Sequence, residues 1–277
     1  MISGGAISMT DDELEQFIEH VKFQTGINLD VSKRYLLESR LSPVLKQFSM
    51  NSYAELLQCV TRDSSAENQA LISAITTNET YFFRDEHPFE LLKSKLVPDL
   101  LGADPHAEVK IASAACSSGQ EAYSIAIILR ELLSDLPKFK VQIKAFDISD
   151  DIISSASKGE YSKFEVQRGL SVDKIKCHFD CYDGRYQVKP ELRSMISFGK
   201  QNILKPKGAT TKFNIIFCRN VVNYFEDNDR ALLFDNLANM LLPGGVLVIG
   251  ATEFLSDQSG NFMKKSDKGS VYYEKAG

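Results

Sequence analysis

The sequence lacks any apolar run long enough to cross a membrane. Its longest apolar stretches, such as VLVIGA from Val246, fall far short of the roughly 18–20 residues that a spanning helix requires. The opening residues MISGGAISMTDDELEQF also lack a basic region followed by an apolar core, so we expect no signal peptide. These absences predict a soluble protein that does not insert into a membrane.

An excess of basic residues is also absent. The 277 residues include 32 Lys and Arg against 37 Asp and Glu, which gives a formal net charge of −5. Because phosphate contacts need clustered positive charge, we expect no nucleic-acid partner. The five cysteines are an odd number, which favours reduced thiols and a cytoplasmic location over a disulfide framework.

The first 76 residues have the pattern of a small helical bundle. Thr10 and Glu13 form a capping box ahead of apolar residues at helical spacing, and Gly26 ends this helix. A second helix is expected from about Ser32, with Pro43 inside it. Its buried residues are predicted to be Leu37, Leu41, Leu45 and Phe48. Two further short helices are expected to open with Ser52 and Glu55 and with Ser64 and Glu67.

The remaining residues have an α/β pattern. The short apolar segments VKIASAAC, VQIKAFD, FNIIFCR and GVLVIGA alternate with helical segments. This alternation predicts a doubly wound, parallel sheet with helices on both faces, in which ligands bind beyond the carboxyl ends of the strands. The alternation breaks at about residues 160–200. We predict a small antiparallel β insertion there, with a tight Asp183-Gly184 hairpin and the segments RYQV and MISF.

The loop SAACSSGQEAYS, residues 113–124, is the first candidate binding element. Small residues after the first strand let a ligand approach the backbone, and the N-terminus of the following helix favours polar or anionic groups. The motifs GxGxxG and GxxxxGK[ST] are absent, which argues against phosphate binding. By itself the loop is equally consistent with a plain turn between strand and helix.

Asp147, at the end of the second strand in AFDIS, is the second candidate. An acidic residue at this position accepts hydrogen bonds from ribose hydroxyls in doubly wound nucleotide-binding folds, and the alternative is an N-cap for the next helix. Together, the loop and Asp147 indicate an adenosine-containing ligand without a pyrophosphate, and S-adenosylmethionine fits. Its sulfonium and amino groups would explain the acidic Glu121, whose alternative role is to complement the helix dipole.

Two further motifs mix aromatic and polar residues. TTNETYFFRDEHPF, residues 76–89, joins the helical part to the sheet domain, and by itself it is best explained as a linker packed by its aromatic side chains. IIFCRNVVNYF, residues 215–225, is a buried strand whose end delivers Arg219, Asn220 and Tyr224 to the same edge as Asp147. Three polar groups converging at that edge favour a site.

Taken together, TNETYFFR, SAACSSGQEAYSIA, AFDIS and FCRNVVNYF resemble the chemotaxis receptor methyltransferases of the CheR family. The resemblance runs from about residue 10 to the end. It implies an all-α receptor-recognition domain at residues 1–76 and an S-adenosylmethionine-binding methyltransferase domain at residues 77–277. It also implies methyl transfer from S-adenosylmethionine to the γ-carboxylates of receptor glutamates, with methyl esters and S-adenosylhomocysteine as products and no metal.

The resemblance further implies a set of site residues. Arg84 and Tyr224 would be the catalytic side chains, with Arg84 nearest the reacting methyl group. The first loop departs from the family's commoner G-E-E-P-Y-S because it reads GQEAYS, but it retains the second acid. The cofactor would be bound by Asn78, Thr80, Arg84, Glu121, Asp147, Asn202, Ile203, Arg219 and Asn220.

The predicted second helix is a candidate docking surface. It carries Lys33, Arg34, Arg40 and Lys46 against one acid, Glu38. Because the methylated regions of the family's receptors are acidic helices, this basic helix would suit them, and the alternative is an ordinary solvated face. Members that tether to a receptor's C-terminal peptide have a longer, Gly-rich loop in the insertion, so we expect independence from that peptide. We also expect a monomer.

Other functions stay open at this point. One is a methyltransferase of the same fold with a small-molecule or nucleic-acid substrate, although the acidic charge and the lack of an N/D-P-P-Y/F run argue against nucleic acid. Another is a non-catalytic cofactor-binding module, against which the presence of Arg84 and Tyr224 argues. A metal site is not expected, because Cys177, His178 and Cys181 offer three ligands and no obvious fourth.

Overall fold

The computed structural model describes residues 8–61, 65–104, 108–133, 140–206, 208, 211–255 and 260–276. The chain divides into two compact units. The first comprises Met1–Thr77 with Tyr224–Glu226, and the second comprises Asn78–Asn223 with Asp227–Gly277. No helix in the described ranges is long and apolar enough to span a membrane.

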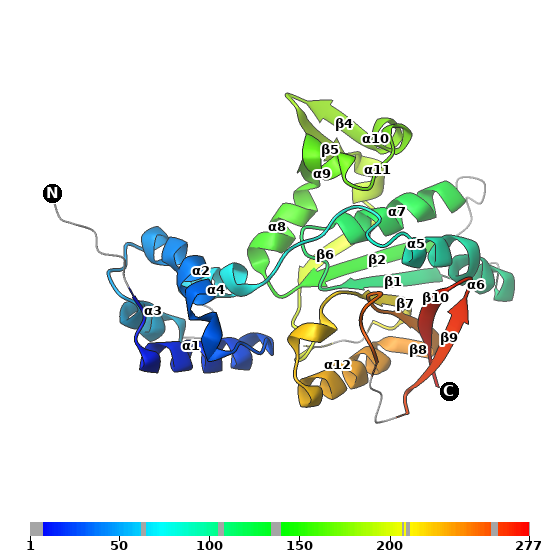
Figure 1. The fold of residues 1–277 in the computed structure, drawn as a ribbon. Helices are drawn as coiled ribbons and strands as arrows, with labels where there is room; N and C mark the ends of the chain where they lie inside the picture. The colour runs from blue at the N-terminus through cyan, green and yellow to red at the C-terminus, as the bar shows by residue number, and fades with distance from the viewer. Residues whose placement is uncertain are drawn as a thin grey trace. The chain divides into compact units, whose positions relative to one another are not determined.

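The first unit is built from short helices (Figure 1). They are α1 (Asp11–Thr25), the 3-10 turn η1 (Val31–Lys33), α2 (Arg34–Gln47), α3 (Tyr53–Val60) and α4 (Ala66–Ile75). The predicted capping box at Thr10 and Glu13 is confirmed, and α1 ends at Gly26, whose φ of 77° is left-handed. Apolar residues of the helices form the core of this unit. In this core the Phe17 and Tyr53 rings pack edge to face, with their centroids 6.2 Å apart.

Two details of this unit differ from the sequence prediction. The N-cap of α4 is Ser65, whose hydroxyl accepts the Asn68 N–H, and the predicted cap Ser64 lies outside the described residues. Phe48 is only half-buried, because it lies one residue beyond the last turn of α2. Val44, one turn earlier, is buried instead.

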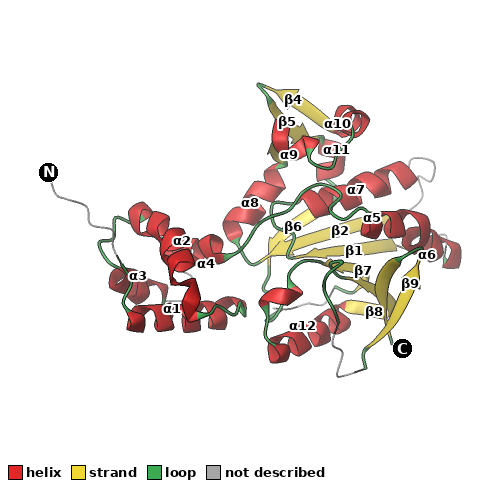
Figure 2. Ribbon diagram, viewed as in Figure 1, coloured by secondary structure: helices red, strands yellow, loops and turns green. Residues whose placement is uncertain are grey.

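The second unit contains a seven-stranded sheet in the order β6-β2-β1-β7-β8-β10-β9 (Figure 2). The strands are β1 (Glu108–Ala114), β2 (Lys140–Asp147), β6 (Ile196–Lys200), β7 (Phe213–Cys218), β8 (Leu241–Val248), β9 (Phe262–Asp267) and β10 (Ser270–Lys275). The first five in spatial order are parallel, and β10 and β9 are antiparallel. The strand order reverses between β1 and β7, so the predicted doubly wound α/β fold is confirmed.

Helices cover both faces of this sheet. α5 (His87–Leu91), the π-helical turn η2 (Leu92–Leu96) and α6 (Val97–Ala103) precede β1, and α7 (Gln120–Leu133) and α8 (Asp150–Lys158) follow β1 and β2. α12 (Asp227–Met240) precedes β8 and lies on the side of the sheet opposite to α7 (Figure 1). The core between these layers is fully buried and includes Ile111, Ile125, Leu129, Ile143 and Phe217.

Between β2 and β6 the chain forms a small antiparallel sheet that is separate from the main one. It has the order β3-β5-β4, formed by β3 (Glu160–Ser162), β4 (Phe179–Tyr182) and β5 (Arg185–Val188), with the short helices α9 (Lys163–Gln167), α10 (Val172–His178) and α11 (Pro190–Arg193). The predicted hairpin is confirmed, since Asp183 and Gly184 have φ values of 47° and 76° and join β4 directly to β5.

The assignment of MISF to this antiparallel insertion was wrong. Ile196, Ser197 and Phe198 belong to β6, which pairs in parallel with β2 at the edge of the main sheet. The segment is too short for periodicity to distinguish a strand of one sheet from a strand of another. The C-terminal hairpin of β9 and β10 was not predicted, although Lys268-Gly269 between two alternating segments is a turn sequence.

Candidate functional site

The carboxyl ends of β1, β2 and β7 meet at one edge of the main sheet. The loop after β1 has a tight backbone, in which Ala115, Ser117 and Gly119 have left-handed φ values of 57°, 49° and 93°. A Cβ at Gly119 would lie 3.0 Å from Cβ of Ala156 on α8, so only glycine fits closely there. The loop is therefore a tight turn of mostly buried residues between β1 and α7.

Asp147 ends β2 at this edge, and its carboxylate is directed to the loop after β1. It accepts hydrogen bonds from the Ser117 N–H at 2.9 Å and from the Ser149 N–H at 3.2 Å. Burial raises the pKa of Asp147, against the opposing effect of backbone N–H groups. The N-cap of α8 is Ser149, which accepts the Ile152 N–H, so the alternative assignment of Asp147 as that cap was wrong.

Glu121, in the first turn of α7, is held by two donors. The Ser113 hydroxyl donates to its Oε1 at 2.7 Å, and Nη1 of Arg219 donates to its Oε2 at 3.0 Å. Arg219 also donates through Nη2 to Asp85 Oδ2 and to the Arg84 carbonyl, both at 2.7 Å. Its side chain is 2% exposed, so a buried guanidinium connects its own strand end to two other segments of the chain, at Glu121 and at residues 84–85.

The segment at residues 78–86 lies along the loop after β1. The Ser117 hydroxyl donates to the Asn78 carbonyl at 3.1 Å, and the Phe83 N–H donates to the Ser124 hydroxyl at 2.9 Å. Arg84 is half-buried, and its Nη1 donates to the Glu79 carbonyl at 2.8 Å. The segment is therefore packed against the binding loop and is more than the aromatic linker that its composition suggested.

The small antiparallel sheet and the residues around it also contact the segment at residues 78–86. Phe82 is fully buried, with ring centroids 5.0 Å from Tyr161 and 5.5 Å from Phe179. Arg168 pairs with Glu79 at 3.0 Å, and its guanidinium lies 4.3 Å from the centroid of the Tyr81 ring. A Cβ at Gly169 would lie 1.8 Å from the Phe82 carbonyl oxygen, so the insertion and the segment touch backbone to backbone.

The residues after β6 complete the edge. The Gln201 N–H donates to the Asp147 carbonyl at 2.8 Å, Asn202 Oδ1 accepts the Leu204 N–H at 2.8 Å, and the Ile203 carbonyl accepts from Asn236 at 3.1 Å. The side-chain nitrogen of Gln201 is buried without a hydrogen-bond partner in the described chain. It is therefore a donor that a ligand at this edge can satisfy.

No site role was predicted for Gln201 or Glu253 of this edge, and Ser113 and Asp85 lay within candidate motifs without a predicted role of their own. Asp85 directly follows Arg84 in TNETYFFRD, so its position in that motif was the available signal. Glu253 is 4% exposed and accepts a hydrogen bond from the Asn220 N–H. The available signal for Glu253 in the sequence was a single acid within an otherwise apolar segment.

The thiols near the edge do not act as nucleophiles. Cys116 lies in the loop after β1, Cys218 ends β7, and both are buried. Burial raises the pKa of both thiols well above the ordinary value, so they stay protonated. Among the described residues, no group of three or more His, Cys, Asp and Glu side chains could hold a metal ion.

Tyr224 and the basic residues belong to the first unit. Tyr224 ends the 3-10 turn η3 (Val222–Tyr224), and its carbonyl accepts the Asn28 N–H at 3.0 Å. Arg34 binds the Met9 carbonyl and Asp11, and Arg40 binds the Ile75 carbonyl and Thr77. These two guanidinium groups stabilise their own unit, whereas the Lys33 and Lys46 side chains are exposed. The catalytic role of Tyr224 and the docking role of this helix stay predictions.

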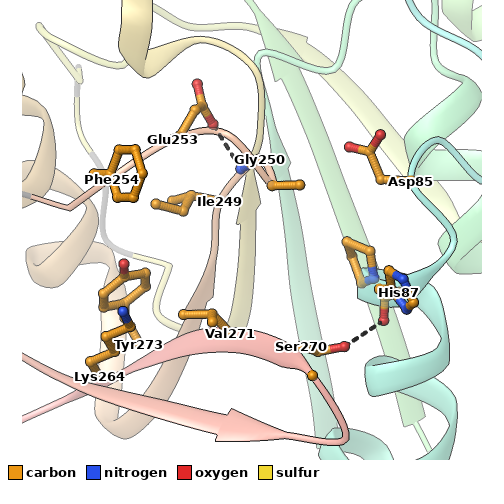
Figure 3. A pocket seen from close by; sticks show the side chains of 13 residues that line it. Asp85, His87, Ile249, Gly250, Glu253, Phe254, Lys264, Ser270, Val271 and Tyr273 are labelled. Carbon is orange, nitrogen blue, oxygen red and sulfur yellow. Dashed lines mark hydrogen bonds between the residues drawn. The ribbon is translucent and has the colours of Figure 1, made fainter.

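A pocket of about 170 Å³ opens beside the same edge, around the end of β8 (Figure 3). Asp85 and His87 line one side, Gly250, Glu253 and Phe254 line another, and the β9–β10 hairpin contributes Lys264, Val271 and Tyr273. None of the site residues implied by the family resemblance is among its thirteen lining residues. The pocket is therefore a separate hollow, which shares Asp85 and Glu253 with the edge.

The charges at the edge fit S-adenosylmethionine. Arg219 contributes one positive charge between Glu121 and Asp85, and this leaves one net negative charge, to which Asp147 adds a second. S-adenosylmethionine, whose sulfonium, ammonium and carboxylate groups give one net positive charge, complements this negative edge. The Asp147 carboxylate and the unpaired Gln201 donor suit ribose hydroxyls and a hydrogen-bond acceptor of the ligand.

Known proteins resemble this chain over nearly its whole length. Residues 12–76 match the family described as CheR methyltransferase, all-alpha domain, and residues 78–270 match CheR methyltransferase, SAM binding domain. Chemotaxis protein methyltransferase 1 of Vibrio cholerae is 38% identical over 272 residues, covering 96% of this chain and 98% of that protein. Chemotaxis protein methyltransferase 1 of Pseudomonas aeruginosa is 35% identical over 274 residues, covering 97% and 100%.

A more distant organism gives the same result. The chemotaxis protein methyltransferase of Borreliella burgdorferi is 36% identical over 253 residues, covering 89% of both chains. The two family matches, these relatives and the doubly wound sheet agree on the family and the fold. The chain is an S-adenosylmethionine-dependent methyltransferase that belongs to the CheR family.

Proposed function

We propose that this chain transfers the methyl group of S-adenosylmethionine to glutamate γ-carboxylates of chemotaxis receptors. The products are glutamate methyl esters and S-adenosylhomocysteine. The observation that carries the proposal is the pair of acids Asp147 and Glu121 at the strand ends of a CheR-family chain, with Arg219 bound to Glu121. All five cysteines are free thiols, which supports our proposal of a cytoplasmic location.

Each side chain at the edge has a proposed task in binding. When bound, S-adenosylmethionine supplies a methyl group on a sulfonium, which is a good leaving group. The Asp147 carboxylate accepts hydrogen bonds from ribose hydroxyls, and Glu121, oriented by Ser113 and Arg219, holds the amino-acid portion. The rest of the binding surface is formed by Asn78, Thr80, Asn202, Ile203 and Asn220.

The acceptor needs no general base. A glutamate carboxylate has an ordinary pKa near ~4.3 and is already ionised at neutral pH. The protein's task is to position that carboxylate in line with the methyl group and to remove part of its water. Arg84, fixed by its bond to the Glu79 carbonyl, attracts the carboxylate, and the Tyr224 hydroxyl orients it without neutralising it.

Two substitutions test these catalytic roles. Arg84→Ala and Tyr224→Phe should each lower turnover by about tenfold or more, because each removes a group that orients the acceptor. Both variants should still fold. The measurement is transfer of labelled methyl from S-adenosylmethionine to receptor-containing membranes, with mapping of base-labile esters.

The matched control is Arg185→Ala, which removes an exposed arginine in the β4–β5 hairpin and should leave the rate unchanged. Wild-type rates from both test variants would refute the assigned roles. If the label appeared in a small molecule, a methyltransferase with a different substrate would be favoured. If no product were labelled, a non-catalytic cofactor-binding module would be favoured.

Asp147→Ala tests the ribose contact. The change should cost about 1–3 kcal/mol of S-adenosylhomocysteine binding, the range for an unmatched buried polar group.

In the wild type, hydroxyl donors favour the ionised form of Asp147, so the affinity for S-adenosylhomocysteine should fall as pH falls through the pKa of Asp147 in the free protein. Because that pKa is raised, the loss begins above the ordinary value of 3.8. Calorimetry in steps of ~1 pH unit, from about pH 8 to about pH 4, measures both effects. An unchanged affinity in Asp147→Ala would contradict the assignment of Asp147 to the ribose contact.

The exposed lysines of the first unit are the better test of receptor docking. Lys33→Glu combined with Lys46→Glu should raise the KM for receptor several-fold, since each exposed charge contributes about 0.2–1 kcal/mol. Cofactor affinity should not change, and the effect should shrink with added salt. Lys93→Glu on η2 is the control for a general loss of charge. Arg34 and Arg40 are unsuitable, because reversing their charge would break contacts within the unit.

We also propose that the chain acts independently of a receptor tether peptide. The support is the two-residue turn at Asp183 and Gly184, which joins β4 to β5 with no longer loop. Titration of the full chain with a receptor C-terminal pentapeptide should therefore give no measurable binding. Saturable binding at micromolar peptide would contradict the proposal.

A further inference from the structure

Glu253 is a buried carboxylate in the loop after β8 that accepts hydrogen bonds from three backbone N–H groups. Its Oε2 accepts the N–H of Gly250 at 2.7 Å and of Asn220 at 2.8 Å, and its Oε1 accepts the N–H of Val222 at 2.7 Å. Figure 3 shows the carboxylate beside the Gly250 backbone. Glu253 therefore connects the main chain of two different loops.

These loops follow neighbouring strands of the sheet. β7 ends at Cys218 and β8 at Val248, and the two strands are paired at Phe217 and Val248. Asn220, two residues beyond β7, has a left-handed φ of 60°, a conformation that Asn tolerates better than most L-residues. The bond from the Asn220 N–H to Glu253 holds the backbone in this conformation.

The fit around the carboxylate leaves no room for another side chain. A Cβ at Gly250 would lie 2.7 Å from Glu253 Oε2, 2.8 Å from Asn220 Nδ2 and 3.0 Å from the Asn220 nitrogen. Gly250 is not among the glycines with positive φ, so this position needs glycine for space and not for its conformation. The Gly250 backbone, Glu253 and Asn220 therefore form one packed cluster.

We infer that Glu253 is a positioning residue of the methyltransferase: it fixes the backbone at Asn220 and Val222 so that Asn220 is ready to bind the cofactor. The inference rests on the proposed function, which assigns Asn220 to the cofactor-binding set. A carboxylate suits this task because both oxygens accept hydrogen bonds. An amide of the same size has one accepting oxygen and an NH2 group that would face a backbone N–H.

The first experiment compares Glu253→Gln, Glu253→Asp and the exposed control Glu90→Gln on α5. S-adenosylhomocysteine binding is measured by calorimetry well below each melting temperature, together with KM and kcat. Glu253→Gln should weaken binding about tenfold or more and raise the KM for S-adenosylmethionine, with the KM for receptor unchanged. Glu253→Asp keeps two acceptors and should lose less, and Glu90→Gln should match the wild type.

The outcomes separate positioning from packing. A role in packing alone would lower the melting temperature, leave the affinity of the folded protein unchanged and favour Gln over Asp, since Gln keeps the size of Glu. Equal affinity in Glu253→Gln and wild type would overturn the inference. If the wild type itself did not bind S-adenosylhomocysteine, the proposed function would fail instead.

A second variant keeps the test decisive if Glu253→Gln does not fold. Gly250→Ala pushes against Glu253 and Asn220 without removing either, and it should weaken S-adenosylhomocysteine binding several-fold or more. Gly102→Ala is the matched control, because its Cβ would meet nothing within 4 Å and its φ is not left-handed. Wild-type affinity in Gly250→Ala would show that the cluster does not set the cofactor site, and the inference would be wrong.

Discussion

The α/β unit depends on one buried guanidinium. Arg219 directly follows β7, and its side chain binds Glu121 at the start of α7 and Asp85 with the Arg84 carbonyl in the segment before α5. Removing one partner from a buried ion pair typically costs about 3–5 kcal/mol, because the remaining charge stays buried. Arg219 thus makes the geometry of three distant segments conditional on one another, and these segments surround the site.

The same ion pairs set the electrostatic character of the site. Two carboxylates share one guanidinium, so the network retains a negative charge that the protein does not neutralise. In the proposed binding mode, Glu121 of this network holds the amino-acid portion of the methyl donor, whose ammonium group complements the negative charge.

The sequence predicted the elements whose causes are local. The capping box of α1, the Asp183-Gly184 hairpin and Asp147 at the end of β2 follow from neighbouring residues and from the rule for strand ends. Glu253 and Asp85 were not predictable in this way, because their partners come from other parts of the chain. The assignment of MISF failed for the same reason, since only its pairing with β2 identifies its sheet.

The contact of the small sheet with Phe82 has a consequence for folding. Phe82 lies before β1, whereas Tyr161, Gly169 and Phe179 lie after β2, so these contacts close a loop that contains both strands. Contacts so distant in sequence form only after the entropy of closing that loop has been overcome. The contacts between the insertion and the segment that carries Arg84 therefore add a cost in loop-closure entropy, whereas the bond of Arg84 to the Glu79 carbonyl is local in sequence.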